Sequence, residues 1–309
     1  MSKKPDWEGK SKGGALGHKI FIVILKNLGV PFAYFILYFV AFYYLLFARK
    51  ANRANRFYFR KIWNYGPLKS IIYAYKSYYV FGQTLLDKVA VLAGITDRYT
   101  FHFDGEENLW DLAEEGKGAI LISAHVGNWE IAGHYLKKLN TPVNVVMVDE
   151  EHRAIKEVMD KSMHKKKFNT IVVKDDFSHL LDLHRAVQNK EIICIHGDRF
   201  VRNMKGKIYR TKFMGQYAAF PRGPFELASR LKVPYSFVFA LKETSKHYHF
   251  FATPGKMSDG NTEQIIEEYV AKVEEIVRNY PEQWFNYFDF WEQPEETTVK
   301  KIATIKAEN

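Results

Sequence analysis

Apolar and polar positions alternate along residues 100–279 as strands and helices alternate in α/β proteins. Short apolar runs bounded by glycine, proline or polar residues predict strands, and longer amphipathic stretches between them predict helices. The predicted strands are 100–104, 119–123, 143–148, 170–173, 192–195, 235–241 and 248–252. The predicted helices are 108–115, 129–139, 151–166, 178–188, 225–231 and 262–279. This order predicts an α/β fold with a mostly parallel central sheet flanked by helices.

The N-terminal part of the chain has a different pattern. Residues 20–47 are almost entirely apolar, and the charge-free stretch from Asn27 to Phe47 is long enough as a helix to cross a hydrocarbon layer of about 30 Å. Basic residues flank it on both sides, so we predict a membrane-anchoring helix. Because Lys26 and Pro31 interrupt the pattern, a tilted or partly embedded helix stays open. A helical hairpin buried in a core is the alternative.

These patterns divide the chain into three parts. Residues 1–61 form a basic N-terminal segment that contains the membrane helix, at about 20–47. Residues 62–295 form the α/β domain, which begins with aromatic-rich helices separated at Gly66-Pro67. Residues 296–309 are a polar tail, expected to fray.

The net charge of +10 belongs to the N-terminal segment, because residues 1–61 hold 12 Lys and Arg against two acids. This placement argues against a main domain that binds nucleic acid. A basic cluster directly after an apolar helix is attracted to anionic lipid on the cytoplasmic side of a membrane. The single cysteine, Cys194, excludes an intramolecular disulfide and lies in an apolar run, which favours a buried position over a nucleophile.

His125 follows the strand 119–123, at the edge where ligands collect in open α/β sheets. Gly127 permits a tight turn, Asn128 occupies an N-cap position, and Glu130 falls in the first turn of the next helix. We predict that Glu130 holds one imidazole nitrogen while the other removes a proton. Because this pair contains no nucleophile of its own, it fits activation of a hydroxyl on an acceptor. An ordinary turn with an incidental histidine remains equally open from spacing alone.

Asp198 and Arg199 follow the strand 192–195 at the same predicted sheet edge. Arg199 fits an anionic headgroup, a phosphate or the oxyanion of a carbonyl addition, whereas a structural Asp–Arg pair is the alternative. A basic run follows, either as a solvated loop or as a surface for an acidic partner: Arg202, Lys205, Lys207, Arg210 and Lys212. No metal site is predicted, because neither His179 and His184 nor His247 and His249 have companions at ligand spacing.

Residues 123–130 resemble the histidine-four-residues-acid motif of the bacterial lipid A biosynthesis acyltransferases, the lauroyl and myristoyl transferases of the lysophospholipid acyltransferase-like superfamily. Further matches are residues 197–199, 213–215, 221–228 and 281–285. With the N-terminal anchor, they cover nearly the whole chain in the family's order. Two departures concern the acceptor: Glu130 replaces the aspartate of the wider glycerolipid acyltransferases, and Gly-Asp-Arg replaces an Asp-Gln pair. Residues 7–14 also resemble relatives encoded with aryl-polyene pathways.

The resemblance implies an O-acyltransferase that takes its acyl chain from a thioester, usually acyl carrier protein with acyl-CoA as the alternative, and needs no cofactor. It implies His125 as base with Glu130 as its orienting partner, and a membrane lipid acceptor similar to a lipid A precursor. Substrate contacts are expected from Asn128, Asp198, Arg199 and Arg222. The expected location is the cytoplasmic side of the inner membrane. Other acceptors stay open, namely a lysophospholipid, an aminolipid or an aryl-polyene lipid, as do a thioesterase and a non-catalytic lipid-binding protein.

Overall fold

The computed structural model describes residues 15–92, 94–139, 141–148, 168–174, 176, 178–200 and 208–291. The predicted helix 151–166, the basic residues Arg202, Lys205 and Lys207, and the polar tail 296–309 lie outside the described residues.

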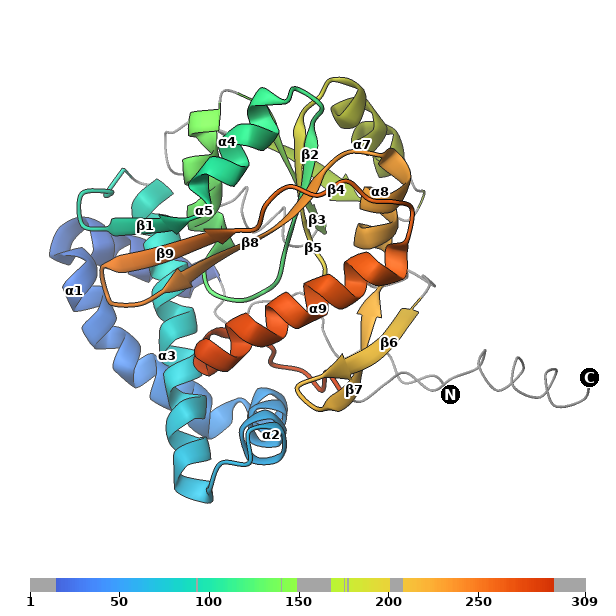
Figure 1. Cartoon of the computed structure of the whole chain (residues 1–309). Helices are drawn as coiled ribbons and strands as arrows, with labels where there is room; N and C mark the ends of the chain where they lie inside the picture. The colour runs from blue at the N-terminus through green and yellow to red at the C-terminus, as the bar shows by residue number, and fades with distance from the viewer. Residues whose placement is uncertain are drawn as a thin grey trace, which may run out of the picture.

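A seven-stranded sheet forms the centre of the molecule (Figure 1), in the order β1-β9-β8-β2-β5-β3-β4. Its neighbours pair in parallel except for β8 and β9, so β1 and β9 run against the other five strands. The prediction of a mostly parallel central sheet is therefore confirmed. The strands are β1 Thr100–Asp104, β2 Ala119–Ser123, β3 Val143–Val148, β4 Asn169–Val173, β5 Ile192–His196, β8 Tyr235–Lys242 and β9 His247–Ala252.

Helices cover both faces of the sheet because the central strands are apolar on both sides. Leu121 of β2 packs with Leu112 of the helix α4 and with Leu136, beyond α5. Ile120 and Ile122 point the other way, into the cluster that contains α7, α8 and α9. The helices on these two faces are α4 Glu106–Glu114, α5 Trp129–Tyr135, α7 His179–Gln188, α8 Gly223–Leu231 and α9 Thr262–Asn279. A 3-10 turn, Leu136–Leu139, completes the helix predicted for 129–139.

A β-hairpin that the sequence analysis did not predict lies against α9, formed by β6 Ile208–Phe213 and β7 Gln216–Pro221. Met214 and Gly215 both have positive φ, 53° and 79°, as a tight hairpin turn requires. Glu267 of α9 accepts hydrogen bonds from Tyr209 and Thr211 of β6. The side chains of Arg210 and Lys212 project outward from β6. In the sequence they are therefore interpreted as part of a basic run that could be a solvated loop.

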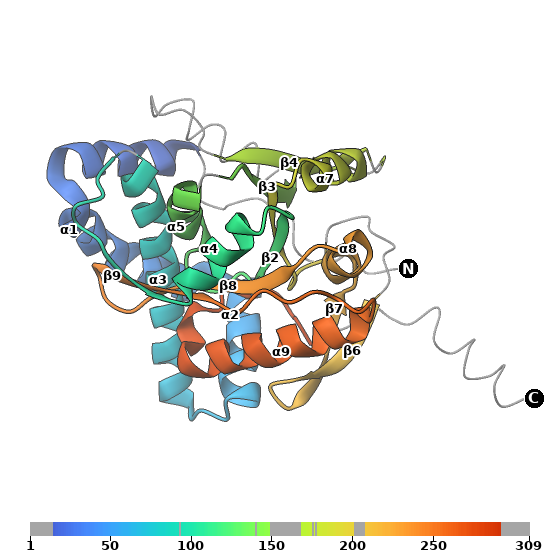
Figure 2. The ribbon, with the colours of Figure 1, turned by 45° about the horizontal axis from the view of Figure 1, so that its top comes forward.

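The N-terminal helix α1, Ala15–Phe47, is kinked at Gly29, which has φ 76°, two residues before Pro31. It packs against the long helix α3, Pro67–Leu92. The residues buried on this side recur at helical spacing: Val30, Ala33, Tyr34, Leu37 and Ala41. Figure 2 shows the two helices together at one side of the molecule.

The opposite side of α1 is apolar and exposed. Phe35, Phe39 and Phe42 are 55%, 64% and 54% exposed, and only 28% of the apolar window within Asn27–Phe47 is buried. A helix in a soluble core would bury such residues, so this exposure argues against the core-hairpin alternative and suggests membrane anchoring. The basic helix α2, Arg49–Phe57, and a π-helical turn, Tyr58–Ile62, connect α1 to α3.

A buried polar cluster joins α1 and α3 to the sheet. Asp87 of α3 is completely buried and pairs with the ammonium of Lys242, 2.6 Å away, at the end of β8. Three tyrosine hydroxyls also donate to this carboxylate: Tyr34 of α1, Tyr99 and Tyr248 of β9. Burial lowers the pKa of Lys242, and the attraction of Asp87 opposes that shift. We call Asp87, Lys242 and the three tyrosines the Asp87 cluster.

Replacing Lys242 by methionine should destabilise the protein by about 3 kcal/mol, because Asp87 would remain buried without its cation. Denaturant unfolding in detergent micelles measures the change. Lys246→Met, on the exposed turn after β8, is the matched control and should leave the midpoint unchanged. Equal midpoints for Lys242→Met and the unmodified protein would contradict this account of the cluster.

Candidate active site

Two neighbouring strands place His125 and Asp198 opposite each other. β2 and β5 are parallel and in register, with Ser123 of β2 beside His196 of β5. His125 and Asp198 each lie two residues beyond these paired positions, at the carboxyl ends of the strands. Because parallel strands end at the same edge of the sheet, the two side chains meet there although 73 residues separate them.

The carboxylate of Asp198 holds His125 at two points. One oxygen lies 2.7 Å from the ring atom Nδ1, and the other accepts a hydrogen bond of 2.9 Å from the backbone N–H of His125. Burial alone would raise the pKa of Asp198, but the attraction of His125, its hydrogen bond and the charge of Arg199 together lower that pKa well below its usual value. Asp198 is therefore ionised and accepts a hydrogen bond. Nδ1 of His125 carries the proton and donates this hydrogen bond.

This hydrogen bond leaves the other ring nitrogen, Nε2, as the site that accepts a proton. Among the residues that the structure describes, none forms a hydrogen bond to it. The ring of His196 lies 4.3 Å from that of His125 and 4.8 Å from that of Trp129, so His125 is packed as well as bonded. Burial, with the charges of His125 and Arg199, lowers the pKa of His196 well below its usual value and keeps that ring neutral at pH 7.

The turn that carries His125 is attached to two other segments. The N–H of Gly127 donates to the carbonyl of Gln283, and the N–H of Phe285 donates to the carbonyl of His125. On the other side, the N–H of Asn128 donates to the carbonyl of Ala240 in β8, at 2.7 Å. Residues 281–285, one of the motifs of the sequence, thus hold the turn in place. Gln283 is itself buried and forms a pair of hydrogen bonds with the backbone of Lys242.

Glu130, the predicted partner of His125, interacts with a different residue. Glu130, in the first turn of α5, forms an ion pair with Lys88 of α3. The carboxylate on Nδ1 belongs to Asp198, whereas the sequence prediction gave that position to Glu130. The sequence does show a charged residue, Asp198, two positions beyond the end of β5. It does not show that β5 lies beside β2, so the contact with His125 could not be predicted.

Asn128 and Arg222, two further residues of the predicted site, form hydrogen bonds with other residues of the protein. Asn128 is buried, and its amide donates to the carbonyl of Thr84 and to the hydroxyl of Tyr248. It occupies the N-cap position of α5, but its side chain makes no capping bond. Arg222 bonds the carboxylates of Glu226 and Glu263, and its hydrogen bond to Glu263 raises its pKa. Substrate contacts from both residues stay predictions.

The Gly-Asp-Arg sequence has a packing explanation at two positions. A Cβ on Gly197 would lie 2.7 Å from the ring of Phe225 and 2.9 Å from that of Tyr269, so only glycine fits between these buried aromatic residues. Arg199 donates to the carbonyl of Phe285, 2.7 Å away, and its guanidinium lies over the ring of Phe288. The 197–199 motif and the 281–285 motif therefore meet beside His125.

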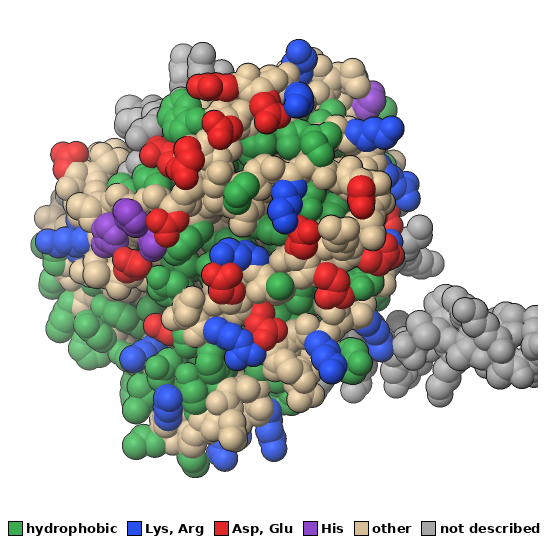
Figure 3. Space-filling view, viewed as in Figure 1, with side chains coloured by type: hydrophobic (Ala, Val, Ile, Leu, Met, Phe, Trp, Pro, Cys, Tyr) green, Lys and Arg blue, Asp and Glu red, His purple; other side chains and the backbone are tan. Residues whose placement is uncertain are grey.

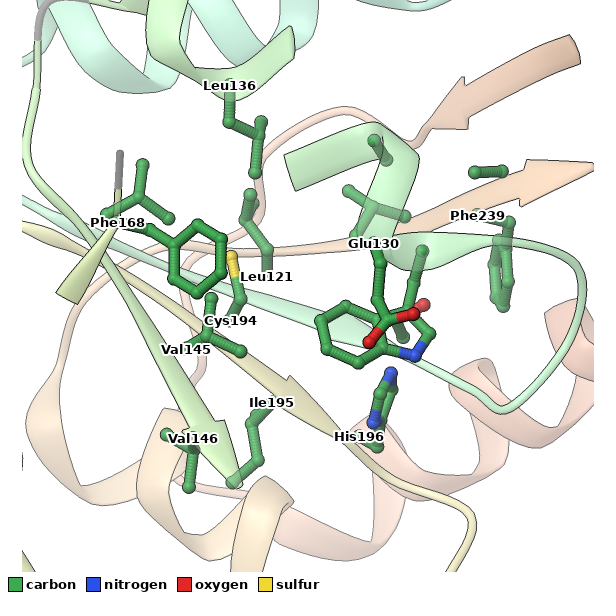
Figure 4. Close-up of a pocket in the computed structure, with 16 residues that line it drawn as sticks. Leu121, Glu130, Leu136, Val145, Val146, Phe168, Cys194, Ile195, His196 and Phe239 are labelled. Carbon is green, nitrogen blue, oxygen red and sulfur yellow. The ribbon is translucent and has the colours of Figure 1, made fainter. Parts of the chain in front are cut away.

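An apolar cavity of about 50 Å³ lies between the sheet and α5. Figure 4 shows Leu136, Phe168 and Val145 at one end, and Glu130 and His196 pointing toward each other at the other end. Cys194 also lines it, and burial raises the pKa of its thiol to about 12, so the thiol stays protonated at neutral pH and is no nucleophile. The hydroxyl of Ser123 lies on the cavity wall, buried and without a hydrogen bond to any described residue.

Residues 68–292 match the family model of the bacterial lipid A biosynthesis acyltransferases. The chain belongs to this family. The matched residues include the whole site and begin at α3, so the family assignment makes this chain an acyltransferase that acts on a lipid acceptor. No match to a curated protein was found.

Among solved structures, this acyltransferase is similar to the 1-acyl-sn-glycerophosphate acyltransferase PlsC from Thermotoga maritima. The identity is 12% and the TM-score 0.37, with 79% of this chain and 95% of that chain covered. A similarity this low carries no argument about the site.

Replacing Gly127 by alanine should displace the His125 turn. Gly127 has φ +66°, and a Cβ there would lie 2.0 Å from the carbonyl oxygen of Ala240. We expect a loss of more than about 2 kcal/mol in unfolding free energy together with reduced acyl transfer.

Gly215→Ala is the control, because Gly215 has φ +79° and no atom within 4 Å of the new Cβ. It should lose only about 1 kcal/mol, from backbone strain alone. Equal losses for the two variants, by thermal or denaturant unfolding, would show that the contact with Ala240 is unimportant.

Proposed function

We propose that this protein transfers a fatty acyl chain from a thioester to a hydroxyl group of a lipid similar to a lipid A precursor, at the cytoplasmic side of the inner membrane. The observation that carries the proposal is the His125–Asp198 pair. The His125 ring packs against that of His196, which lines the apolar cavity. A histidine oriented in this way, with no activated nucleophile beside it among the residues that the structure describes, is suited to deprotonating a hydroxyl that comes from a substrate.

In the proposed reaction, Nε2 of His125 removes the proton of the acceptor hydroxyl as its oxygen attacks the thioester carbonyl. The tetrahedral intermediate collapses with cleavage of the carbon–sulfur bond. The leaving thiolate then takes the proton from His125, and the enzyme returns to its starting state. No acyl-enzyme forms, because His125 acts as base rather than nucleophile.

Asp198 has two tasks in this reaction. Its hydrogen bond keeps the proton on Nδ1, so that Nε2 is free to accept one, and its charge stabilises the imidazolium that forms. The prediction that Glu130 orients His125 is the competing proposal. It would require the hydrogen bond of Nδ1 to move from the carboxylate of Asp198 to that of Glu130. We favour a role for Glu130 in the cavity wall, where its ion pair with Lys88 holds α5 against α3.

The cavity is suited to the part of the acyl chain nearest the thioester, because apart from its polar end it is lined by Leu, Val, Ile, Ala, Phe and Cys side chains. An engineered apolar cavity of about 150 Å³ holds one benzene molecule. The cavity of about 50 Å³ must therefore widen before an alkyl chain enters. We propose that the Ser123 hydroxyl or the Arg199 guanidinium stabilises the oxyanion at the polar end.

Two surfaces are proposed for the substrates. The exposed apolar face of α1 lies in the membrane, where the lipid acceptor is held, with the basic helix α2 near anionic headgroups. The acidic acyl carrier protein docks on basic surface near residues 202–212, of which Arg210 and Lys212 are exposed on β6. Substrate contacts are also proposed for Asn128, Asp198, Arg199 and Arg222.

His125→Asn should abolish acyl transfer, because the ring nitrogen that accepts the proton is lost. The assay supplies acyl carrier protein loaded with a labelled acyl chain to purified protein in vesicles made from bacterial lipids, and mass spectrometry follows the products. His184→Asn, at an exposed position of α7, is the control and should retain full activity.

Three outcomes of this assay would contradict the proposal. Unchanged transfer by His125→Asn would remove His125 from the mechanism. Release of free fatty acid without acylated lipid would indicate a thioesterase. Lipid binding without turnover would indicate a non-catalytic protein.

Asp198→Asn should lower the rate of transfer by about 10²–10⁴-fold while the protein stays folded, because the neutral amide no longer stabilises the imidazolium. Glu130→Gln should have a much smaller effect, and Asp182→Asn, on the exposed side of α7, should have none. The same transfer assay ranks the three variants. A greater loss for Glu130→Gln than for Asp198→Asn would favour Glu130 as the orienting residue.

A further inference from the structure

A group of histidine and acidic side chains lies at the edge of the sheet, outside the active site. β1 is one of the two edge strands of the central sheet and pairs in parallel with β9, so that His102 lies directly beside His249. Asp104 is two residues beyond His102 and therefore projects from the same face of the sheet. In Figure 3 this group of histidines lies at the surface over β1 and β9, with acidic side chains around it.

The three side chains converge on one point. The Nε2 atoms of His249 and His102 lie 2.9 Å and 3.3 Å from the two carboxylate oxygens of Asp104, and the ligand atoms of all three residues lie within 4.8 Å of one another. Ligands of a tetrahedral zinc ion, at bond lengths of 2.0–2.2 Å, are about 3.4 Å apart. Each imidazole therefore already lies near the required separation from one oxygen of Asp104. A bound ion would draw the three ligand atoms closer together from their present separations of up to 4.8 Å.

The position of His249 is difficult to explain with a neutral imidazole alone. Its Nδ1 lies 3.0 Å from Glu243 and its Nε2 lies 2.9 Å from Asp104, so each nitrogen faces a carboxylate oxygen. A neutral ring carries one N–H, and its other nitrogen would then direct a lone pair at an oxygen. A positive charge between His249 and Asp104 removes this repulsion, either as a second proton or as a metal ion.

Glu243 is placed where a carboxylate would accept a hydrogen bond from a metal-binding histidine. Metal-binding histidines commonly donate their second N–H to a carboxylate, which fixes the tautomer and the ring orientation. Glu243 occupies this place for His249 and is held by the hydroxyl of Tyr280.

We propose that His102, Asp104 and His249 bind one divalent cation of the zinc class, with water completing the coordination and Glu243 orienting His249. Two imidazoles and one carboxylate favour zinc and its neighbours in the first transition row, whereas magnesium and calcium prefer oxygen ligands alone. The bound ion connects the edge strand β1 to β9. Its position is separate from the proposed transfer reaction, which needs no metal.

The test measures zinc binding to the full-length, tag-free protein in detergent after removal of metals with a chelator. We expect one equivalent of Zn²⁺ to bind by calorimetry and to raise the unfolding temperature, while Mg²⁺ has no such effect. Co²⁺ in the same site should give a visible absorption band typical of low-symmetry nitrogen and oxygen coordination.

His102→Ala is the decisive variant, because His102 is 61% exposed at its side chain and its loss should not disturb folding. It should abolish the Co²⁺ band and the zinc-dependent shift in unfolding temperature. Glu243→Gln, which keeps all three ligands, should weaken zinc binding by roughly 10–100-fold. His184→Asn, an exposed histidine elsewhere, should bind as the unmodified protein does.

Two results would overturn the proposal. Absence of zinc binding in the unmodified protein would show that His102, Asp104 and His249 do not form a metal site. Binding that survives His102→Ala at full strength would place the ion at other residues. Neither result would bear on His125 and Asp198, because acyl transfer is assayed separately.

Discussion

Parallel pairing between β2 and β5 aligns Ser123 with His196, and the geometry of the active site depends on this alignment. It brings His125 and Asp198 into hydrogen-bond contact, and it places the His196 ring against His125. Because side chains alternate between the faces of a strand, a shift of one residue would turn Asp198 away from His125. Gly197 protects the register, since the rings of Phe225 and Tyr269 leave no room for a side chain there.

A second constraint connects the apolar helix α1 to the turn that carries His125. Asp87 of α3 accepts hydrogen bonds from Tyr34 of α1 and from Tyr248 of β9, and the Tyr248 hydroxyl also accepts a hydrogen bond from Asn128. Asn128 lies three residues beyond His125. One buried polar cluster therefore joins the apolar helix, the sheet and the turn that carries His125. This connection holds the proposed active site at a set distance from the lipid surface in which α1 is proposed to lie.

Much of the fold was predictable because strands and helices leave local patterns of apolar residues. The seven strands of the central sheet were expected nearly at their observed bounds, and Gly66-Pro67 does separate two helices. The β6–β7 hairpin was not predicted, because in β6 the apolar Ile208 is exposed and the polar Thr211 is buried, which weakens the alternation of apolar and polar residues. The partner of His125 could not be read from the sequence either, since strand order decides it. The same reason hid the cluster of His102, Asp104 and His249, because Asp104 and His249 are 145 residues apart in the chain.

The central claim is that His125 serves as the base in acylation of a membrane lipid. Mass spectrometry of total lipids tests it most directly. It compares cells that lack the gene with the same cells after reintroduction of either the unmodified gene or the His125→Asn variant. The account predicts that one lipid class loses a single acyl chain without the gene, regains it with the unmodified gene, and stays underacylated with the variant. Identical lipid profiles in all strains, or full recovery with His125→Asn, would contradict it.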